Sequence, residues 1–179
     1  MEFKEEMVSQ ETVYEGVIVN VRRDKARLMD GRITDREVVE HPGGVAVFAM
    51  DDQGRVALVR QYRYPYAKVL LEVPAGKLEY GEDHFEAAKR ELSEEIGAEA
   101  REWIPMGEML PTPGFCDELQ PVYLARGLTF GQMHPDEDEF LERVKMPLSE
   151  AVEMAIDGRL EDSKTVASIL RAAGRLKKL

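Results

Sequence analysis

Three glutamates stand close together in the segment Glu91-Leu92-Ser93-Glu94-Glu95. On a helix, Glu91 and Glu95 lie on one face because residues four apart are neighbours, and Glu94 borders them. Like charges at this spacing destabilise an isolated helix by roughly 0.2–0.5 kcal/mol per pair. Hard divalent cations, which prefer oxygen ligands, would offset this repulsion. The cluster therefore predicts a metal site, with a solvated acidic helix face as the simpler alternative.

The residues before this helix favour the metal interpretation. Pro74-Ala75-Gly76 ends a predicted strand and turns into a loop, and Gly76 has no side chain, so backbone carbonyls can approach an ion closely. Two or three Mg²⁺ ions held there could clamp phosphate oxygens, neutralise their charge and lower the pKa of bound water. A carboxylate beside that water would serve as general base. These residues thus predict metal-assisted hydrolysis of a phosphate compound.

The helix that must carry the glutamates is predicted over residues 83–96. Its apolar residues Phe85, Ala88, Leu92 and Ile96 are spaced by three, four and four positions and form one apolar face. The glycine that follows suits a helix stop. An arginine next to the first glutamate can pair with a carboxylate one turn away on either side.

The rest of the chain predicts the scaffold around this helix. Strands are expected at 13–21, 36–41, 45–50, 55–61, 69–73, 101–110, 119–129 and 140–146, and further helices at 149–157 and 163–176. Residues 1–10 are charged and aperiodic, which predicts a frayed terminus. Strands interspersed with a few helices predict an α/β fold with a mixed sheet between helices.

Composition narrows the class of protein. The chain has 179 residues, 44% of them hydrophobic, which is enough for a core. Its net charge of −11 argues against nucleic-acid binding, which relies on basic patches. The single cysteine excludes an intrachain disulfide, and no segment resembles a signal peptide or a membrane span. A cytoplasmic protein that binds neither nucleic acid nor membranes is expected.

The segment from residue 76 to residue 98 resembles the Nudix box at each of the positions that define it. The match consists of Gly76, five residues, Glu82, seven residues, Arg90-Glu91, the aliphatic Leu92, one residue, Glu94-Glu95, one residue and Gly97; the final aliphatic position is filled by Ala98. The resemblance implies the Nudix α/β/α sandwich with a mixed sheet. It also implies hydrolysis of a nucleoside diphosphate linked to another moiety.

The resemblance assigns roles to residues of the box. It implies that Glu91, Glu95 and the backbone carbonyl of Ala75 are metal ligands, with Glu94 assisting as a ligand and in catalysis. It implies that Arg90, which can pair with Glu86 or Glu94, orients a glutamate of the box. The cofactor implied is Mg²⁺, with Mn²⁺ as an alternative, in two or three ions.

Segments outside the box resemble the ADP-ribose pyrophosphatase group of this family. The loop 111–118 is similar to the substrate loop of that group and implies substrate contacts for Pro113, Gly114 and Phe115. The segment 59–65 implies that Arg63 binds the substrate, and the segment 71–79 implies the same for Glu72. Each of these residues, taken alone, is equally compatible with an ordinary loop or surface strand.

The same group implies a general base and a dimer. A glutamate of the acidic loop 136–139 acts there as base or metal ligand, and this sequence offers Glu137 and Glu139 without distinguishing them. Residues 1–42 resemble an extra N-terminal antiparallel sheet that takes part in dimerisation, and residues 43–179 form the Nudix domain. A homodimer acting on a small nucleoside diphosphate substrate is expected.

The expected reaction is Mg²⁺-dependent cleavage of ADP-ribose to AMP and ribose 5-phosphate. One alternative is the same chemistry on another nucleoside diphosphate sugar or a dinucleotide cofactor. Action on oxidised nucleoside triphosphates or capped RNA is disfavoured by the acidic charge and by the loop 111–118. An inactive Nudix fold used as a binding module is a further alternative, which the retained, mutually repelling glutamates argue against.

Overall fold

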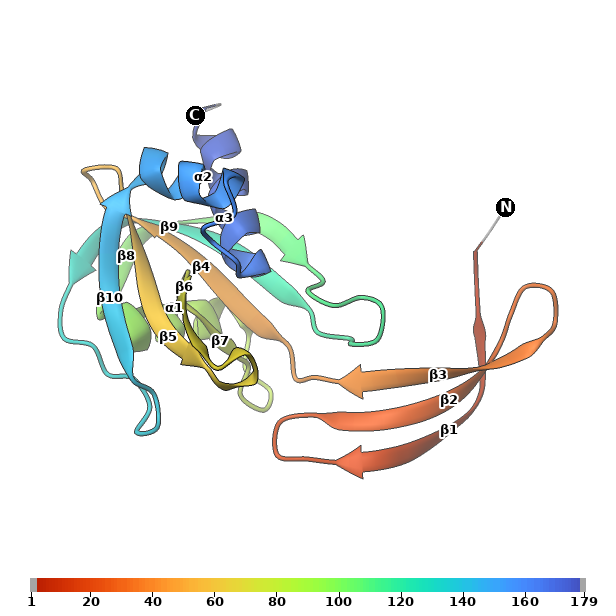
Figure 1. Cartoon of the computed structure of the whole chain (residues 1–179). Helices are drawn as coiled ribbons and strands as arrows, with labels where there is room; N and C mark the ends of the chain where they lie inside the picture. Colours follow the sequence, from red (N-terminus) through yellow and green to blue (C-terminus); the bar gives the residue numbers. More distant parts are fainter. Residues whose placement is uncertain (1–2, 178–179) are drawn as a thin grey trace. The chain divides into compact units, whose positions relative to one another are not determined.

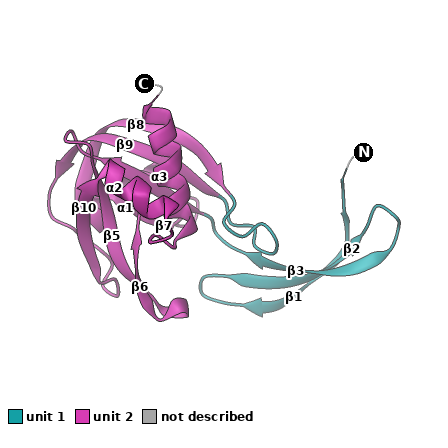
Figure 2. Cartoon of the chain, turned by 45° about the horizontal axis from the view of Figure 1, so that its top comes forward, with its two compact units in different colours: residues 1–43, 110–119 teal, residues 44–109, 120–179 magenta. Residues whose placement is uncertain are grey.

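The computed structural model describes residues 3–177, which fall into two compact units (Figure 2). The smaller unit takes the chain up to residue 43 together with residues 110–119. The larger unit takes residues 44–109 and the chain from residue 120 onward. The loop 110–119, expected as part of the Nudix domain, is thus grouped with the N-terminal sheet.

The smaller unit is built on an antiparallel sheet with the strand order β1-β2-β3 (Figure 1). The strands are β1 (Glu6–Glu15), β2 (Asn20–Arg27) and β3 (Ile33–Glu40). Every residue of β1 is exposed, and ion pairs link neighbouring strands. Arg23 of β2 binds Glu11 of β1 at 2.7 Å, and Lys25 of β2 binds Asp35 of β3 at 2.5 Å. Charge pairs across the sheet therefore contribute to its register.

Two expectations for this part of the sequence were wrong. A single strand was expected at 13–21, but a turn closed by a hydrogen bond from Gly16 N to Val19 O, 3.0 Å long, separates β1 from β2. A Cβ on Gly16 would lie 2.7 Å from that carbonyl oxygen, so the turn needs a glycine. Residues 6–10 belong to β1 instead of a frayed end, while residues 1 and 2 lie outside the described part. An exposed strand paired through charged side chains shows no apolar alternation, which explains why residues 6–10 were not predicted to be a strand.

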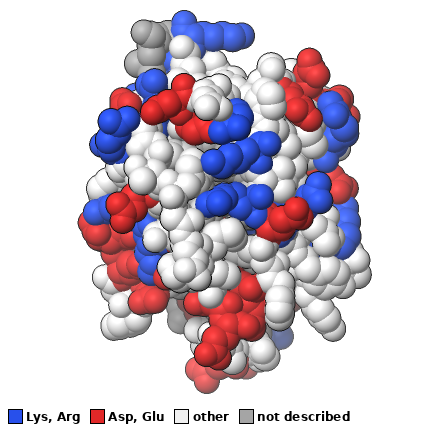
Figure 3. Space-filling view, turned by 90° about the vertical axis from the view of Figure 1, so that its left-hand side faces the viewer, with Lys and Arg blue, Asp and Glu red and all other residues white. Residues whose placement is uncertain are grey.

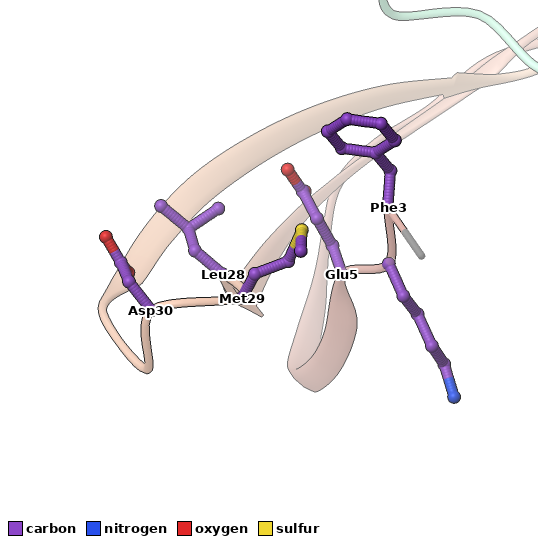
Figure 4. Close-up of a pocket in the computed structure, with 6 residues that line it drawn as sticks. Phe3, Glu5, Leu28, Met29 and Asp30 are labelled. Carbon is purple, nitrogen blue, oxygen red and sulfur yellow. The ribbon is translucent and has the colours of Figure 1, made fainter. Parts of the chain in front are cut away.

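Hydrogen bonds join the loop 110–119 to β3. Val39 N donates to Phe115 O at 2.7 Å, Asp117 N donates to Val39 O at 3.1 Å, and His41 N donates to the Asp117 carboxylate at 2.8 Å. A pocket of the same unit lies where the chain enters β1 and where β2 leads into β3 (Figure 4). Its lining residues are Phe3, Lys4, Glu5, Leu28, Met29 and Asp30. None of the residues expected to act in catalysis or binding lines this pocket.

The larger unit is an α/β/α sandwich around a mixed sheet (Figure 1). Its strands are β4 (Gly44–Met50), β5 (Arg55–Arg63), β6 (Lys68–Glu72), β7 (Ala75–Lys77), β8 (Ala98–Met109), β9 (Gln120–Phe130) and β10 (Leu141–Pro147). The order is β10-β5-β4-β9-β8, with β6 paired to β5 and β7 paired to β4. Only β4 and β9 run parallel among these pairs of the described chain.

Helices cover both faces of this sheet. They are α1 (His84–Ile96), α2 (Leu148–Ile156) and α3 (Ser163–Leu176), with a 3₁₀ turn η1 (Tyr64–Tyr66) between β5 and β6. Strand β4 is buried along its whole length: Val45 and Val47 pack in the cluster that contains α1, while Ala46 and Phe48 pack in the cluster that contains α2 and α3. A strand covered on both faces reads as a continuous apolar run, which is how the sequence presents it.

The expected elements of this unit agree with the structure to within a few residues, with one omission. Residues 75–77 were expected to be a turn and loop, but they form the short strand β7, which pairs Ala75 with Ala46 and Gly76 with Val45. A three-residue strand containing glycine carries no periodicity from which it could be predicted.

Charged side chains of both signs lie on the surface. Figure 3 shows one face on which acidic and basic side chains are interspersed. Within residues 3–177, none of the helices has the length and apolar run that crossing a membrane requires.

Candidate active site

Helix α1 presents the box glutamates as predicted. Its N-cap Asp83 accepts hydrogen bonds from two backbone N–H groups of the first turn, and Gly97, at φ 60°, ends it. Glu91 and Glu95 lie on the buried side of the helix, and their residues are only 8% and 2% exposed. Glu94, one position off this face, is half-buried. The helix therefore places two carboxylates side by side at the edge of the core.

Strand β7 closes over these two carboxylates. The backbone N–H of Ala75 donates to Glu95 Oε2 at 2.9 Å. A Cβ built on Gly76 would lie 1.9 Å from Glu91 Oε1 and 2.1 Å from its Cδ, so the Glu91 carboxylate occupies the space that a side chain at Gly76 would take. Both contacts depend on β7 being held against the central strand β4. The glycine of the box thus makes room for a carboxylate in this structure.

Arg90 organises the remaining carboxylates. Its Nε and Nη2 bind Glu82 Oε1 and Oε2 at 2.8 and 2.9 Å. Its Nη1 donates to Glu91 Oε1 at 2.7 Å and to Glu94 Oε2 at 2.9 Å. Of the two partners considered from the sequence, the structure selects Glu94, because Glu86 pairs with the lysine three residues after it. One guanidinium therefore connects three glutamates of the box.

Burial is the main influence on the pKa values of Glu91 and Glu95. Loss of hydration raises the pKa of Glu91 to about 7, against the opposing effect of Arg90. Burial also raises the pKa of Glu95 well above its ordinary value, opposed by the Ala75 N–H, and the neighbouring Glu91 and Glu139 charges raise it further. Two desolvated carboxylates that disfavour negative charge form an environment that a cation would stabilise.

The donor set fits a divalent cation. Mg²⁺ is usually bound by one or two carboxylates and completed by waters and substrate phosphates. Glu91 and Glu95 are two such carboxylates, and the backbone at Ala75, bonded to Glu95, brings a carbonyl-bearing residue to the same place. In residues 3–177 no group of three or more acidic, His or Cys side chains is arranged to hold an ion. Glu94, the expected third carboxylate, is turned to Arg90.

The acidic loop before β10 contributes a further carboxylate. Glu139 is half-buried and accepts a hydrogen bond from Gln61 Nε2 at 3.4 Å. Burial and the nearby Asp136 raise its pKa, and its charge in turn raises the pKa values of Glu91 and Glu95. Glu137 is exposed. The structure thus brings Glu139 into the electrostatic environment of the box.

Arg63 and Glu72, both expected to contact substrate, bind each other. Arg63 Nε and Nη2 donate to the two oxygens of Glu72, each at 2.7 Å, and the Glu72 side chain is 1% exposed. The Arg63 charge partly opposes the rise in the pKa values of Glu95 and Glu139 that burial causes. Sequence analysis missed a third partner, Lys164, whose Nζ binds Glu72. In the sequence, only its place in the first turn of a predicted helix distinguished that lysine.

Pro113, Gly114 and Phe115 belong to the smaller unit. They lie in the loop that is hydrogen-bonded to β3, where Phe115 O accepts from Val39 N. The carboxylates of the box, Arg63, Glu72 and Glu139 all belong to the larger unit. The larger unit by itself therefore carries every charged residue expected to act in catalysis.

The ion pair between Arg63 and the buried Glu72 makes the stability of the fold depend on pH. Burial would raise the pKa of Glu72, but the hydrogen bond from Arg63 and the charge of Lys164 outweigh it and hold the pKa below the ordinary 4.5. Glu72 therefore stabilises the fold above about pH 4.5, and this contribution is lost as the pH falls through the lower folded-state pKa. We expect Glu72→Gln to reduce the free energy of unfolding at pH 7 by roughly 3 kcal/mol, because the nearly buried Lys164 and the partly buried Arg63 lose their counter-charge.

Urea unfolding of the wild type and of Glu72→Gln from pH 7 to pH 3 measures this effect. The difference between them should shrink below pH 4.5. The matched control is Glu161→Gln, which removes an exposed carboxylate paired with Lys68 and should cost under about 0.5 kcal/mol. A difference between wild type and Glu72→Gln that stays constant down to pH 3 would contradict the assignment.

Comparison with known proteins identifies the class. The NUDIX domain pattern matches residues 40–169, and the pattern described as the nucleoside diphosphate sugar hydrolase N-terminal domain matches residues 5–39. The chain belongs to the Nudix family of hydrolases.

Individual relatives cover most of the chain. A protein of Mycobacterium tuberculosis (strain ATCC 25618 / H37Rv) described as ADP-ribose pyrophosphatase is 40% identical, over 92% of this chain and 81% of its own length. A Bacillus methanolicus protein described as methanol dehydrogenase activator is 38% identical, over 93% of this chain and 91% of its own. A crystal structure described as an ADP compounds hydrolase has a TM-score of 0.86, covering 98% of this chain and 95% of that one, at 23% identity. That likeness supports the Nudix fold.

Proposed function

We propose that this protein hydrolyses the diphosphate bond of ADP-ribose, giving AMP and ribose 5-phosphate, with a divalent cation such as Mg²⁺. The observation that carries the proposal is the buried Glu91–Glu95 pair, held against β7 by the Ala75 N–H and by the space at Gly76. The relative described as ADP-ribose pyrophosphatase, 40% identical over most of the chain, supports the substrate.

Residues of the larger unit would bind the metal and orient its ligands. Glu91, Glu95 and the Ala75 carbonyl would hold two or three metal ions. Glu94 would be an additional ligand after its carboxylate leaves Arg90 and binds the metal. A bound divalent cation neutralises phosphate charge and lowers the pKa of water. Arg90 keeps the carboxylates of the box oriented through its bonds to Glu82 and Glu91.

The substrate would be bound by residues outside the box. Arg63, anchored on Glu72, offers a guanidinium edge to the diphosphate, since Arg binds phosphate oxygens in a bidentate manner. For Pro113, Gly114 and Phe115 of the smaller unit, the support for substrate contacts is the resemblance of the loop 111–118 to the substrate loop of ADP-ribose pyrophosphatases.

We assign the general base to Glu139. Its burial, its raised pKa and its hydrogen bond from Gln61 support this choice over the exposed Glu137. We expect Glu139→Gln to lower kcat by about 10²-fold, since a positioned base contributes at least about that much. Glu137→Gln is the matched control, from the same loop, and should stay within about threefold of wild type. Steady-state AMP release measures both, and the opposite ranking would reassign the base to Glu137.

The direct test of the function is AMP release from ADP-ribose with Mg²⁺ and with EDTA. ADP-glucose, GDP-mannose and NADH serve as competing substrates. Metal-dependent cleavage that is fastest for ADP-ribose is the expected result. Faster cleavage of another compound would retain the chemistry of the box and reject the substrate assignment. Thermal stabilisation by Mg²⁺ without turnover of any nucleotide would indicate a binding module.

We further propose that the protein is a cytoplasmic homodimer in which residues 1–42 contribute to the subunit contact. The observation in support is the exposure of apolar residues on the small sheet, among them Met7, Val8, Val13 and Tyr14 of β1. Exposed apolar surface of this kind is typical of interfaces between proteins. Sedimentation equilibrium of the full chain tests the proposal, and a monomer at micromolar concentration would reject it.

A further inference from the structure

The N-terminus of α3 is bonded to the short link between β6 and β7, which leads into the candidate active site. The N-cap Asp162 accepts from Thr165 N at 2.9 Å, and Val73 N donates to Thr165 Oγ1 at 2.9 Å in a buried contact. Two residues beyond Val73, the Ala75 N–H binds the box residue Glu95. The start of α3 thus helps to position the segment that carries a proposed metal ligand.

Lys164 lies at the centre of this junction. Its Nζ binds Glu72 Oε2 and lies 3.0 Å from Asp162 Oδ1, and its side chain is only 13% exposed. Arg63 Nε donates to Glu72 Oε1, and its Nη2 donates to Oε2, the oxygen that also binds Lys164. Two cations and two anions thus form a nearly buried cluster of zero net charge.

The geometry of Arg63 determines what the cluster can do. A bidentate contact through Nε and Nη2 uses one edge of the guanidinium and leaves the Nη1 edge for a second anion. The orientation of that edge depends on the Glu72 carboxylate, which in turn is held by Lys164. Without the lysine, the cluster of Glu72, Asp162 and Arg63 would carry a net charge of −1 at the guanidinium that faces the substrate.

We propose that Lys164 is a positioning residue for substrate binding: by holding Glu72, it sets the Arg63 guanidinium to receive the diphosphate of the substrate. The inference rests on the proposed function for the identity of the substrate. Lys164 itself does not contact substrate and acts through Glu72. Because Arg63 binds the diphosphate in the ground state as well as in the transition state, loss of its positioning acts on KM more than on kcat.

The test compares Lys164→Met with four other variants in ADP-ribose hydrolysis with Mg²⁺. We expect Lys164→Met to raise KM about tenfold, with kcat within about threefold, as for loss of uniform binding. Lys164→Arg keeps the charge and should restore KM to within about threefold. The control Lys68→Met removes an exposed lysine paired with Glu161 and should stay within about twofold. In a Glu72→Gln background, the further change Lys164→Met should alter KM by less than about twofold.

Several results would overturn the proposal. A lower Tm of Lys164→Met with unchanged KM would show a structural role only. An equal effect of Lys164→Met with and without Glu72→Gln would show that it does not act through Glu72. Calorimetric binding of ADP distinguishes failure of this inference from failure of the proposed function. If the wild type binds ADP without cleaving ADP-ribose, the function is wrong, and a tenfold weaker affinity of Lys164→Met still supports the positioning role. Equal ADP affinities, or no ADP binding by the wild type, reject it.

Discussion

Replacing Glu95 by glutamine is expected to reduce metal-dependent hydrolysis of ADP-ribose by about 10³–10⁴-fold. A bound metal contributes several kcal/mol to transition-state stabilisation, and each 1.36 kcal/mol is a factor of about ten. The amide keeps an oxygen that can accept from the Ala75 N–H, so the fold has no reason to change. Because burial disfavours the charged form of Glu95, the neutral side chain should be tolerated at least as well in the absence of metal.

AMP release and thermal unfolding, each with Mg²⁺ and with EDTA, measure the effect of Glu95→Gln. Its Tm in EDTA should equal or exceed that of the wild type, and stabilisation by Mg²⁺ should be lost. The control is Glu86→Gln on the same helix, where the carboxylate is 63% exposed and paired with Lys89. This control should keep wild-type activity. Near-normal turnover of Glu95→Gln would refute the assigned metal site.

Gly76→Ala is expected to lower turnover by about 10³-fold while changing stability much less. The new Cβ would lie 1.9 Å from Glu91 Oε1, so the carboxylate must move away. The clash is with the far end of a flexible side chain, and Glu91 can rotate at little cost to the fold. The rotation removes a proposed metal ligand from its place, and a misplacement of about 1 Å already costs about 10²-fold.

The matched control for Gly76→Ala is Gly174→Ala in α3. No atom lies within 4 Å of a Cβ built there, and alanine is the better helix former. It should keep full activity with an equal or higher Tm. AMP release and Tm measured on both variants test the prediction. If Gly76→Ala lowered Tm, and its lower activity were fully explained by the fraction of unfolded protein, the glycine would be needed for the fold and not to make room for the Glu91 carboxylate.

Local sequence was sufficient for the helix of the box. The spacing of Leu92 and Ile96, the acidic cap and Gly97 are all contained within about four turns of chain, so the bounds of α1 and the shared face of Glu91 and Glu95 could be predicted. The same holds for β4, whose apolar run identified a central strand. The small sheet was predicted poorly because β1 is exposed along its length and its pairing relies on charges from other strands.

The sequence by itself determined the Nudix class, the chemistry of the carboxylates and the segment that holds them, because these depend on residue types at short spacing. The tertiary structure decided which partners meet. It placed Glu139 rather than Glu137 in the environment of the box, paired Arg63 with Glu72, and brought Lys164 to that pair from 92 residues away in the chain. Such contacts depend on how β6, β10 and α3 pack together, and no local pattern records the packing of distant elements.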